Sequence, residues 1–537
     1  MKTRLLPLLL TLSLLVTLLA PCTVSAASSV EKTKIGNSSA YWEYDAKTAV
    51  LSVTGKGEIP DFYNSGKQPW QSLYMDVKAI RVGSGITRIG DYAFDNLNTT
   101  TEVTLPDTLL SIGYCSFRSC SALEKLTLPA SVKELGQNAF ANMLALKSLT
   151  FPDKLTRIEG EVCKDCVSLE QVAISKNAKI IAWEAFSNCK KLDNLVIPDS
   201  VEEIQHDAFE KNISLQKITF GKNLKRIGYR AFFGCDRLDE IELPDSLTEI
   251  ENNAFCECTS LSRVVIGKNV ASLGMSAFGY CPKLIEVCNR SALDLKPGSE
   301  DNSLVTEHAK NVYTPSAGES KLKTKDGFVF YDSDDYTCLL RYDGTKTKLT
   351  TPNIGKNYEI YDYAFYKDDK ITSLKISDKV TKVGEEALWF CRSLEELTFG
   401  KLTSVVYHCL TDCPVLTSIT FLCPVVDFYN SWSQFPKTAT IYGYAGSTAE
   451  TTFGYRYSPY TFVSLGEPPK VEIPLGDING DTVVNAMDCL ILKGYILKTL
   501  RNATAEQIAR MDLNGVGGIN AMDYAVLRSI VLGKYNG

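Results

Sequence analysis

Apolar residues recur along the first half of the chain with a period of 23 residues. An Ala-Phe dipeptide marks the pattern, an isoleucine or leucine precedes each anchor by five residues, and a leucine follows most anchors by six. The nine anchors are Phe94, Phe117, Phe140, Cys163, Phe186, Phe209, Phe232, Phe255 and Phe278. A fixed period of this length predicts one structural unit per repeat and a core shared by stacked units.

Each unit contains a short stretch in which apolar and polar residues alternate. In LEKLTL, residues 123–128, the alternation places Leu126 and Leu128 inward and Lys125 and Thr127 outward, as in a strand that Pro129 ends. The spacing matches the strand signature of leucine-rich repeats. We therefore expect a β-rich, right-handed repeat solenoid with a β cap at each end.

The combination LPxSVxxIGxxAFxxCxxL resembles the BspA-type leucine-rich repeats of bacterial surface proteins, over about residues 41–466. The stretch WEYDAKTAVLSVTGKGEI is similar to the N-terminal β cap of that family, and TIYGYAGSTAETTF is similar to its closing unit. A second, less regular set of repeats is anchored by Phe365, Leu388 and Leu410.

The pattern divides the chain into seven segments. A signal peptide (1–26) is followed by an N-terminal cap (27–74) and the 23-residue repeats (75–288). An irregular insertion (289–350) contains DGFVFYDSDDYTCLLRYDG, which is typical of a β-hairpin. The second array and closing cap (351–463), a short stiff linker with two adjacent prolines (464–474) and a C-terminal module (475–537) complete the chain.

The C-terminal module contains one twelve-residue phrase twice, as DINGDTVVNAMD and DLNGVGGINAMD. Oxygen atoms at loop positions 1, 3, 5, 7, 9 and 12 suit calcium, and an apolar helical pattern follows each loop. The expected ligands are Asp477, Asn479, Asp481, the Val483 carbonyl, Asn485 and Asp488 in the first loop, and Asp512, Asn514, the Gly518 carbonyl, Asn520 and Asp523 in the second. We therefore expect two Ca²⁺ sites in this module.

The second calcium site is expected to be the weaker one. Val516 stands at position 5, where the first loop has Asp481, so the second loop offers two carboxylates against three.

Residues 475–537 resemble a type I dockerin, a small all-α calcium-binding module that binds a cohesin domain. The resemblance implies docking onto a scaffoldin or surface protein in a cellulosome-like or cell-surface assembly. It also places recognition at loop positions 10 and 11 and on the following helix. The corresponding residues are Ala486, Met487, Lys493, Gly494, Lys498, Ala521, Met522, Arg528 and Ser529.

The N-terminus predicts export. Lys2 and Arg4 precede an apolar stretch, and Val24-Ser25-Ala26 forms a small-residue cleavage site. Cys22 raises a lipoprotein alternative, which Pro21 disfavours. Later segments are too short to span a bilayer, and a net charge of −6 without a basic patch disfavours nucleic acid. We expect an extracellular protein held to a surface through its scaffold.

Cysteine recurs three residues after the anchor, in a position that also accepts Leu97, Met143 and Asn212. That exchange favours a buried ladder of free thiols over disulfides. The C-x-x-C at Cys163 and Cys166 is interpreted in the same way, because both residues occupy repeat core positions.

The sequence favours a non-catalytic protein whose repeats bind another protein or mediate adhesion. His206, His308 and His408 have no credible nucleophile partner, and outward strand positions such as Glu124 and Lys147 are charged rather than aromatic. Two alternatives stay open. One is an accessory carbohydrate-binding subunit, and the other is a polysaccharide-degrading O-glycosyl hydrolase component, although only about sixty residues remain outside the repeats and the dockerin-like module. The solenoid ligand is an unknown protein or glycan.

Overall fold

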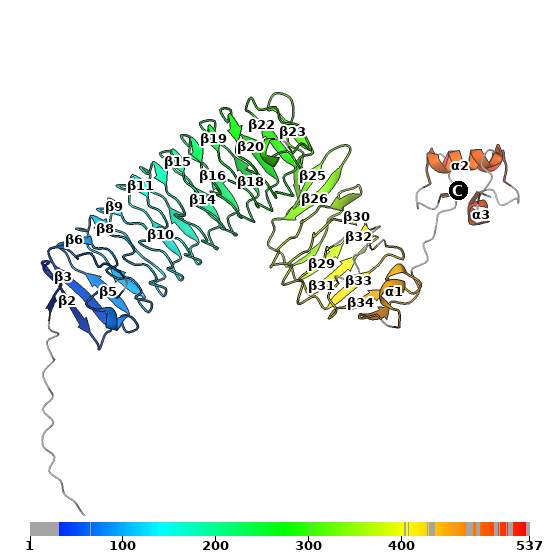
Figure 1. Ribbon diagram of the computed structural model, residues 1–537. Helices are drawn as coiled ribbons and strands as arrows, with labels where there is room; N and C mark the ends of the chain where they lie inside the picture. Colours follow the sequence, from blue (N-terminus) through cyan, green and yellow to red (C-terminus); the bar gives the residue numbers. More distant parts are fainter. Residues whose placement is uncertain are drawn as a thin grey trace, which may run out of the picture. The chain divides into compact units, whose positions relative to one another are not determined.

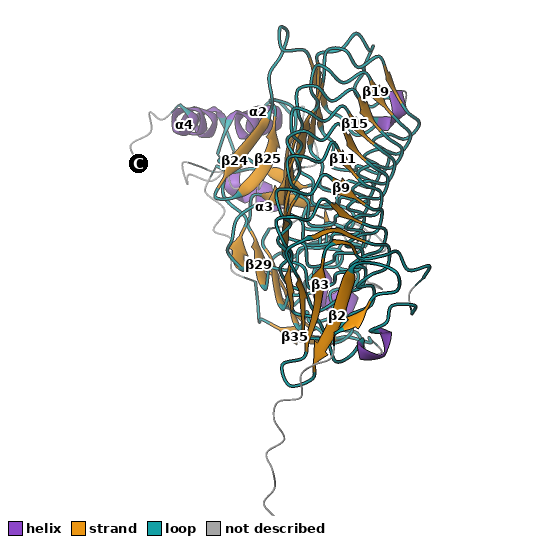
Figure 2. Ribbon diagram, turned by 90° about the vertical axis from the view of Figure 1, so that its left-hand side faces the viewer, coloured by secondary structure: helices purple, strands orange, loops and turns teal. Residues whose placement is uncertain are grey.

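The computed structural model describes residues 32–64, 66–300, 302–401, 404–405, 408–426, 428, 435–456, 458–468, 476–479, 484–498, 503, 505–511, 513 and 519–532. They form two units, divided after residue 440, which are described separately. Unit 1 is a stack of short strands joined by turns (Figure 1), and loops make up most of each repeat (Figure 2).

A mixed sheet caps the N-terminal end of unit 1. Its strands, in spatial order, are β1 (Thr33–Lys34), β2 (Ala40–Asp45), β3 (Val50–Gly55), β5 (Ala79–Val82) and β7 (Glu102–Thr104). The cap is antiparallel from β1 to β3 and parallel from there on. Trp70, just before the 3-10 helix η1 (Gln71–Leu73), stacks on the first anchor, Phe94, at 5.6 Å and donates its indole N–H to the Ala93 carbonyl at 2.9 Å. The cap therefore covers the apolar end of the anchor column.

The repeats build parallel sheets on two faces of the solenoid. Residues 23 apart pair directly, as in Arg157 with Ile180 and Asn194 with Lys217, so one repeat is one turn. One face has β4 (Gly57–Glu58), β6 (Ile86–Ile89), β8 (Ser111–Ile112), β9 (Glu134–Leu135), then β11 (Arg157–Ile158), β13 (Ile180–Ile181), β15 (Glu203–Ile204), β17 (Arg226–Ile227), β19 (Glu249–Ile250) and β21 (Ser272–Leu273). The other has β10 (Ser148–Thr150), β12 (Gln171–Ala173), then β14 (Asn194–Val196), β16 (Lys217–Thr219), β18 (Glu240–Glu242), β20 (Arg263–Ile266), β22 (Glu286–Asn289) and β23 (Asn311–Tyr313).

The turn around each anchor is also held by hydrogen bonds between repeats. The residues two before and two after the anchor adopt positive φ, as at Asp207 (55°) and Lys211 (56°) around Phe209. Such backbone is unfavourable for non-glycine residues unless its surroundings fix it. Here the Asp207, Phe209 and Lys211 N–H groups donate to carbonyls of the next repeat at 2.9, 2.8 and 2.7 Å, which holds the turn in place.

The anchor side chains form a stacked aromatic column inside the solenoid. From Phe186 to Phe278 successive ring centroids are 5.1–5.3 Å apart. Cys163 interrupts the column, and Phe151 packs edge-on against Phe186 at 5.9 Å beside this gap. A larger residue at a neighbouring core position thus accompanies the smaller anchor.

The stretch 123–128 follows the predicted alternation but not the predicted regular strand. Leu126 and Leu128 are buried while Lys125 and Thr127 are exposed, as expected. The backbone makes a single bridge there, from Lys125 to Ser148. Burial of the leucines thus fixes the orientation of the segment without a continuous hydrogen-bond ladder.

The cysteines of the described residues are free thiols, and all but Cys489 are buried. The thiols three residues after an anchor donate hydrogen bonds to the anchor carbonyl of the preceding repeat. Examples are Cys120 to Phe94 at 3.3 Å, Cys235 to Phe209 at 3.4 Å and Cys391 to Phe365 at 3.1 Å. These cysteines therefore fill the core and also satisfy a buried backbone acceptor. Burial raises the pKa of Cys120 and Cys235 well above the usual range of a thiol, which disfavours the reactive thiolate.

The segment between the arrays contributes strands to both. β23 pairs in parallel with β22, and the buried Glu286 carboxylate accepts hydrogen bonds from Ser320 and from the backbone N–H of Lys321. The 3-10 helix η2 (Asn302–Leu304) precedes β23. Then β24 (Leu322–Lys325), β25 (Phe328–Asp332) and β26 (Thr337–Tyr342) form an antiparallel meander, and β26 pairs in parallel with the first strand of the second array.

The second array repeats the two-faced arrangement. One sheet continues from β26 through β28 (Tyr358–Ile360), β30 (Val380–Val383) and β32 (Ser404–Val405). The other contains β27 (Lys348–Thr350), β29 (Ser373–Ile376), β31 (Glu396–Phe399) and β33 (Ser418–Phe421). The anchors Phe365, Leu388 and Leu410 are buried, so the second array uses the same core positions as the first.

Unit 2 contains the closing segment and three helices. The closing segment has β34 (Thr440–Gly443), α1 (Thr448–Phe453) and β35 (Thr461–Ser464), and Ser447 caps α1 by accepting from the Glu450 N–H. The helices that follow are α2 (Ala486–Ile496), α3 (Ala505–Met511) and α4 (Ala521–Val531). Their buried core consists of Ile478, Leu492, Met511, Leu513 and Leu527.

Candidate docking module and recognition surfaces

Both C-terminal loops end in the same capping box. In the first, Asn485 accepts from the Met487 N–H at 2.7 Å, and Asp488 accepts from the Asn485 N–H at 2.9 Å. In the second, Asn520 and Asp523 make the equivalent bonds at 2.7 and 2.9 Å. These side chains satisfy N–H groups that a helix leaves without partners, so the repeated phrase determines where each helix starts.

The closing aspartate of each loop also reaches back to its beginning. Asp488 accepts from the N–H groups of Ile478 and Asn479 at 2.8 and 3.1 Å, and Asp523 accepts from the Leu513 N–H at 2.9 Å. In both copies loop position 12 is therefore close to position 2. Gly476, directly before the first loop, has a φ of +96°. A Cβ at this position would lie 2.9 Å from the Leu527 side chain of the second copy.

The donor chemistry of the described loop residues fits calcium. Asp477, Asp488 and Asp523 are carboxylates with no exposed surface, and Asn479, Asn485 and Asn520 supply amide oxygens. Among the described residues no group of three or more acidic, histidine or cysteine side chains could hold a metal. The remaining predicted ligands, namely Asp481, Val483, Asp512, Asn514 and Gly518, lie outside the described residues, as does Val516.

The residues predicted to contact a cohesin are accessible. Met487 and Met522 are 54% and 62% exposed, beside the exposed Ala486 and Ala521. On the same helices and their ends, Lys493, Lys498 and Arg528 are exposed, and Gly494 and Ser529 are partly exposed. Each loop copy thus presents an apolar pair and a basic group.

Sequence reasoning missed Leu490, which is 63% exposed on α2, one turn after Met487. Residues three apart on a helix are neighbours, so Met487 and Leu490 form one apolar surface. The equivalent residue on α4 is Ala525, which is smaller. The sequence difference between Leu490 and Ala525 could have indicated this surface.

The outward face of the solenoid sheet is charged, and its side chains form ion pairs between repeats. Lys147 pairs with Glu124 at 2.6 Å, and Arg290 pairs with Glu242 at 2.7 Å. A depression of about 640 Å³ over β14, β16, β18 and β20 is lined by Lys217, Phe220, Glu240 and other residues. The lining combines charges of both signs with apolar residues such as Phe220, which suits a protein partner.

The histidines occupy ordinary surface environments. His206 is half exposed, stacks on Trp183 with centroids 6.1 Å apart, and has its Nδ1 3.1 Å from Asp207. His308 lies 3.6 Å from Glu307. His408 Nδ1 lies 3.2 Å from the Thr411 hydroxyl. These contacts orient the rings within the turns.

Comparison with known proteins assigns both parts of the chain. The model of the BspA type leucine-rich repeat region matches residues 73–193, 179–293 and 345–434, and the dockerin type I model matches residues 475–532. No curated protein matches the chain. None of the described helices has the length and apolarity that crossing a membrane requires.

Solved structures with similar folds include three leucine-rich repeat proteins. A protein from Bacteroides ovatus is 19% identical, with 81% of this chain and 100% of that chain covered and a TM-score of 0.40. A protein from Eubacterium ventriosum is 17% identical, with 83% of this chain and 98% of that chain covered and a TM-score of 0.34. A cell surface protein from Faecalibacterium prausnitzii is 21% identical, with 79% and 91% covered and a TM-score of 0.28. On the family matches, which cover more than half of its length, the chain belongs to the BspA-type leucine-rich repeat family and carries a C-terminal type I dockerin domain.

Proposed function

We propose that this is a secreted, non-catalytic protein that docks through its calcium-dependent dockerin onto a cohesin-bearing scaffold, either cellulosome-like or at the cell surface. The solenoid then presents a surface for protein binding or adhesion. Both matching families are binding modules, which supports a role without catalysis. The observation that carries the docking half is the duplicated arrangement of a capped loop followed by an exposed methionine.

The exposed residues suggest what the partner surface offers. Met487 and Met522 are large, flexible and apolar, and such side chains adapt to irregular partner surfaces. Lys493 and Arg528 lie one or two turns further along each helix and favour acidic groups on the cohesin. Because α2 adds Leu490, the first copy offers the larger apolar contact.

The proposed metal dependence follows from buried charge. Asp477 and Asp488 are both fully buried in one loop, and carboxylates without a counterion repel each other there. Calcium supplies that positive charge when bound. We propose two unequal sites, with the first loop tighter because it contains Asp481 where the second contains Val516.

The docking proposal is tested with the full mature chain and a panel of immobilised cohesins, with and without calcium. We expect calcium-dependent capture by at least one cohesin, and a loss of at least about tenfold in affinity when Met487→Glu and Met522→Glu are combined. Met275→Glu is the matched control, because Met275 is 71% exposed on the solenoid. Capture that is insensitive to chelator, or equal for the double variant and the control, would refute the proposal.

Secretion is tested separately. Sequencing the N-terminus of the exported protein should find Ala27 as its first residue, because Val24-Ser25-Ala26 precedes it. A mature protein that retains residues 1–26 would contradict export through this signal.

A further inference from the structure

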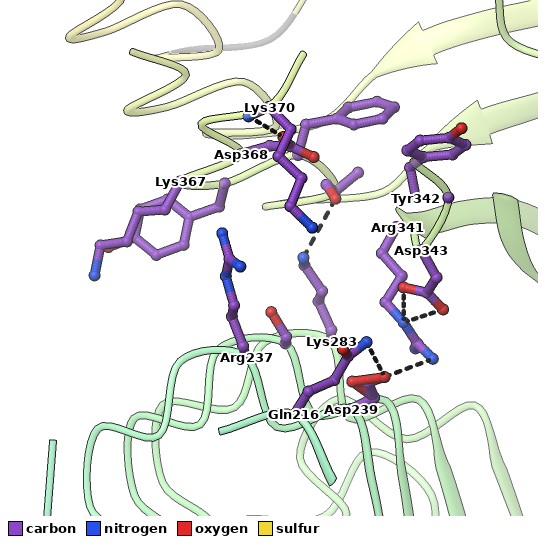
Figure 3. A pocket seen from close by; sticks show the side chains of 15 residues that line it. Gln216, Arg237, Asp239, Lys283, Arg341, Tyr342, Asp343, Lys367, Asp368 and Lys370 are labelled. Atoms are coloured by element: carbon purple, nitrogen blue, oxygen red, sulfur yellow. Dashed lines mark hydrogen bonds and ion pairs between the residues drawn. The ribbon is translucent and has the colours of Figure 1, made fainter. Parts of the chain in front are cut away.

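The two repeat arrays of unit 1 enclose a cavity where they meet (Figure 3). Its volume is about 110 Å³, and its walls come from the turns of the first array, from β26 and from the first anchor turn of the second array. An adjoining cavity of about 320 Å³ shares Arg237, Ser260, Tyr366 and Lys367 with it. The two cavities together form one recess, which we call the junction recess.

Three cations converge on the junction recess from the same position of the repeat. Arg237, Lys283 and Lys370 each lie five residues after an anchor, namely Phe232, Phe278 and Phe365. Figure 3 shows Arg237 and Lys283 rising from the first array and Lys370 descending from the second. Early repeats have small uncharged residues in this position: Thr99, Ala122, Ala145 and Ser168. Lys191 is a cation in the same position of another repeat, but it is exposed and does not line the recess.

Lys283 is the most deeply placed of the three. Its side chain is 2% exposed, and its ammonium group donates to the Ala364 carbonyl at 3.3 Å. Burial, and to a smaller extent the nearby Arg341, lower the pKa of Lys283 from its ordinary value to about 7. Holding a charge there costs stability, which an anion in the recess would offset.

Five aspartates line the recess, and one of them, Asp236, pairs with Lys367 at 2.6 Å. Asp239 accepts from Gln216 at 2.9 Å, and Asp343 accepts from Arg341 at 2.9 Å. The carboxylate of Asp368 accepts from the Lys370 backbone N–H at 2.9 Å. Among the described residues, none of these carboxylates forms an ion pair with Arg237, Lys283 or Lys370. Nearby aspartates act on Lys283 only without direct ion pairs, so an anion in the recess would give the three cations a direct partner.

Aromatic rings line the wider part of the recess. Tyr366 and Phe390 lie in its wall, and Phe390 stacks on Trp389 with centroids 4.8 Å apart. Arg392 lies 5.6 Å from the Phe390 centroid. Flat apolar faces next to cations suit a ligand that has both an apolar ring face and an anionic group.

The acceptors in the recess distinguish between ligands. Asp239, Asp343 and Asp368 have oxygen atoms that can accept hydrogen bonds from hydroxyl groups. The same three carboxylates would repel a peptide with several acidic side chains. A ligand that places only one carboxylate in the recess, next to several hydroxyls, meets both requirements, and one residue of a sugar acid does so.

We propose that the junction recess binds a uronate residue of an acidic polysaccharide. Its carboxylate lies among Arg237, Lys283 and Lys370, and its ring packs against Tyr366 and Phe390. The site lies entirely within unit 1 and does not depend on the proposed cohesin docking.

The test is calorimetric titration of the full mature chain with short uronate oligosaccharides: galacturonate, glucuronate and guluronate trimers, with calcium omitted because uronates bind it. We expect at least one trimer to bind, and Arg237→Gln to weaken it by at least about tenfold, since it removes a charge-assisted hydrogen bond. Phe390→Ala should weaken it as well.

The matched control is Lys191→Gln, an exposed cation five residues after the anchor Phe186, which should change affinity by less than about twofold. Methyl esters of the same trimers keep the ring and lose the charge, so they should bind at least about tenfold more weakly. Failure of all three trimers to bind, equal affinity in Arg237→Gln and Lys191→Gln, or tighter binding of inorganic sulfate or a tetra-aspartate peptide would overturn the proposal.

Discussion

The solenoid and the dockerin are both built from repeated sequence, but they are stabilised in different ways. The first array shares one apolar cluster that extends from Ile35 to Ala309, with an aromatic column at its centre. Among the described residues of the dockerin, five apolar side chains form the buried core, and the carboxyl groups of Asp477, Asp488 and Asp523 are buried as well. A module of about sixty residues has little core, and such domains commonly rely on a metal. The repeats therefore accumulate stability by stacking, whereas we expect the dockerin to depend on a bound ion.

Asp488→Ala should have the largest effect, and only on the dockerin. The substitution removes the Asp488 half of the α2 capping box and the bonds to Ile478 and Asn479, together with a predicted calcium ligand. We expect cohesin affinity to fall by about 100-fold or more, while the melting of the solenoid stays unchanged. Asp523→Ala in the weaker copy should be the milder change. Equal losses for the two variants in a cohesin binding assay would contradict unequal copies.

Phe232→Ala should destabilise the solenoid and leave calcium binding unchanged. Phe232 has no exposed surface and stacks between Phe209 and Phe255 at 5.2 and 5.1 Å. Removing a buried phenyl ring costs about 3–5 kcal/mol. Phe232→Leu is the control, because leucine is the natural anchor at position 388 and should cost less. Urea unfolding followed by circular dichroism measures the free energy of unfolding of both variants. A loss below about 1 kcal/mol for the alanine variant would contradict a stabilising role of the aromatic column.

Lys283→Met should stabilise unit 1 in a pH-dependent way. The pKa of Lys283 falls from near 10.5 to about 7, so the folded chain binds the proton less tightly than the unfolded chain. The stability penalty is therefore complete below pH 7 and disappears as the pH rises past 10.5. The variant should melt higher than the parent at pH 6–7, and the difference should vanish near pH 10.5.

Arg341, Asp239, Asp343 and Asp368 act most strongly on Lys283, and Arg237, Lys367 and Lys370 line the same cavity. Burial raises the pKa of Asp239 to about 6, so this carboxyl titrates below the window. Lys191→Met, in the same repeat position but exposed, is the control and should show no such trend. A melting difference that is independent of pH would contradict a buried, weakly basic Lys283.

Val516→Asp should have the smallest effect. A third carboxylate in the second loop should tighten its calcium site by about tenfold, which is roughly 1.4 kcal/mol. Asp481→Val should weaken the first site by a similar factor. Calorimetry of the unmutated protein should resolve two unequal sites, and two indistinguishable ones would remove the basis for this asymmetry.

The repeated parts of the fold were predictable because each repeat is a local copy of the next. The 23-residue period predicted stacked units, seen in the pairing of Leu149 with Val172, and the Leu/Met/Cys exchange predicted buried thiols. The second strand of each repeat, such as Arg157–Ile158, was not predicted. The hydrogen bond from each thiol to the anchor carbonyl of the preceding repeat could not be predicted, because it depends on the exact orientation of one turn relative to the next. The junction recess was missed for a related reason. Lys283 and Lys370 occupy the same repeat position, but 87 residues with a β-hairpin separate them, and only tertiary packing brings them together.

The difference between the two units is tested most directly by hydrogen–deuterium exchange of the full mature chain in calcium and in chelator. The account predicts that the amides of α2 (Ala486–Ile496) and α4 (Ala521–Val531) lose protection when calcium is removed, while those of β16 (Lys217–Thr219) and β18 (Glu240–Glu242) keep theirs. Equal protection of α2 and α4 in both conditions, or a loss of protection in β16 and β18 on chelation, would contradict it.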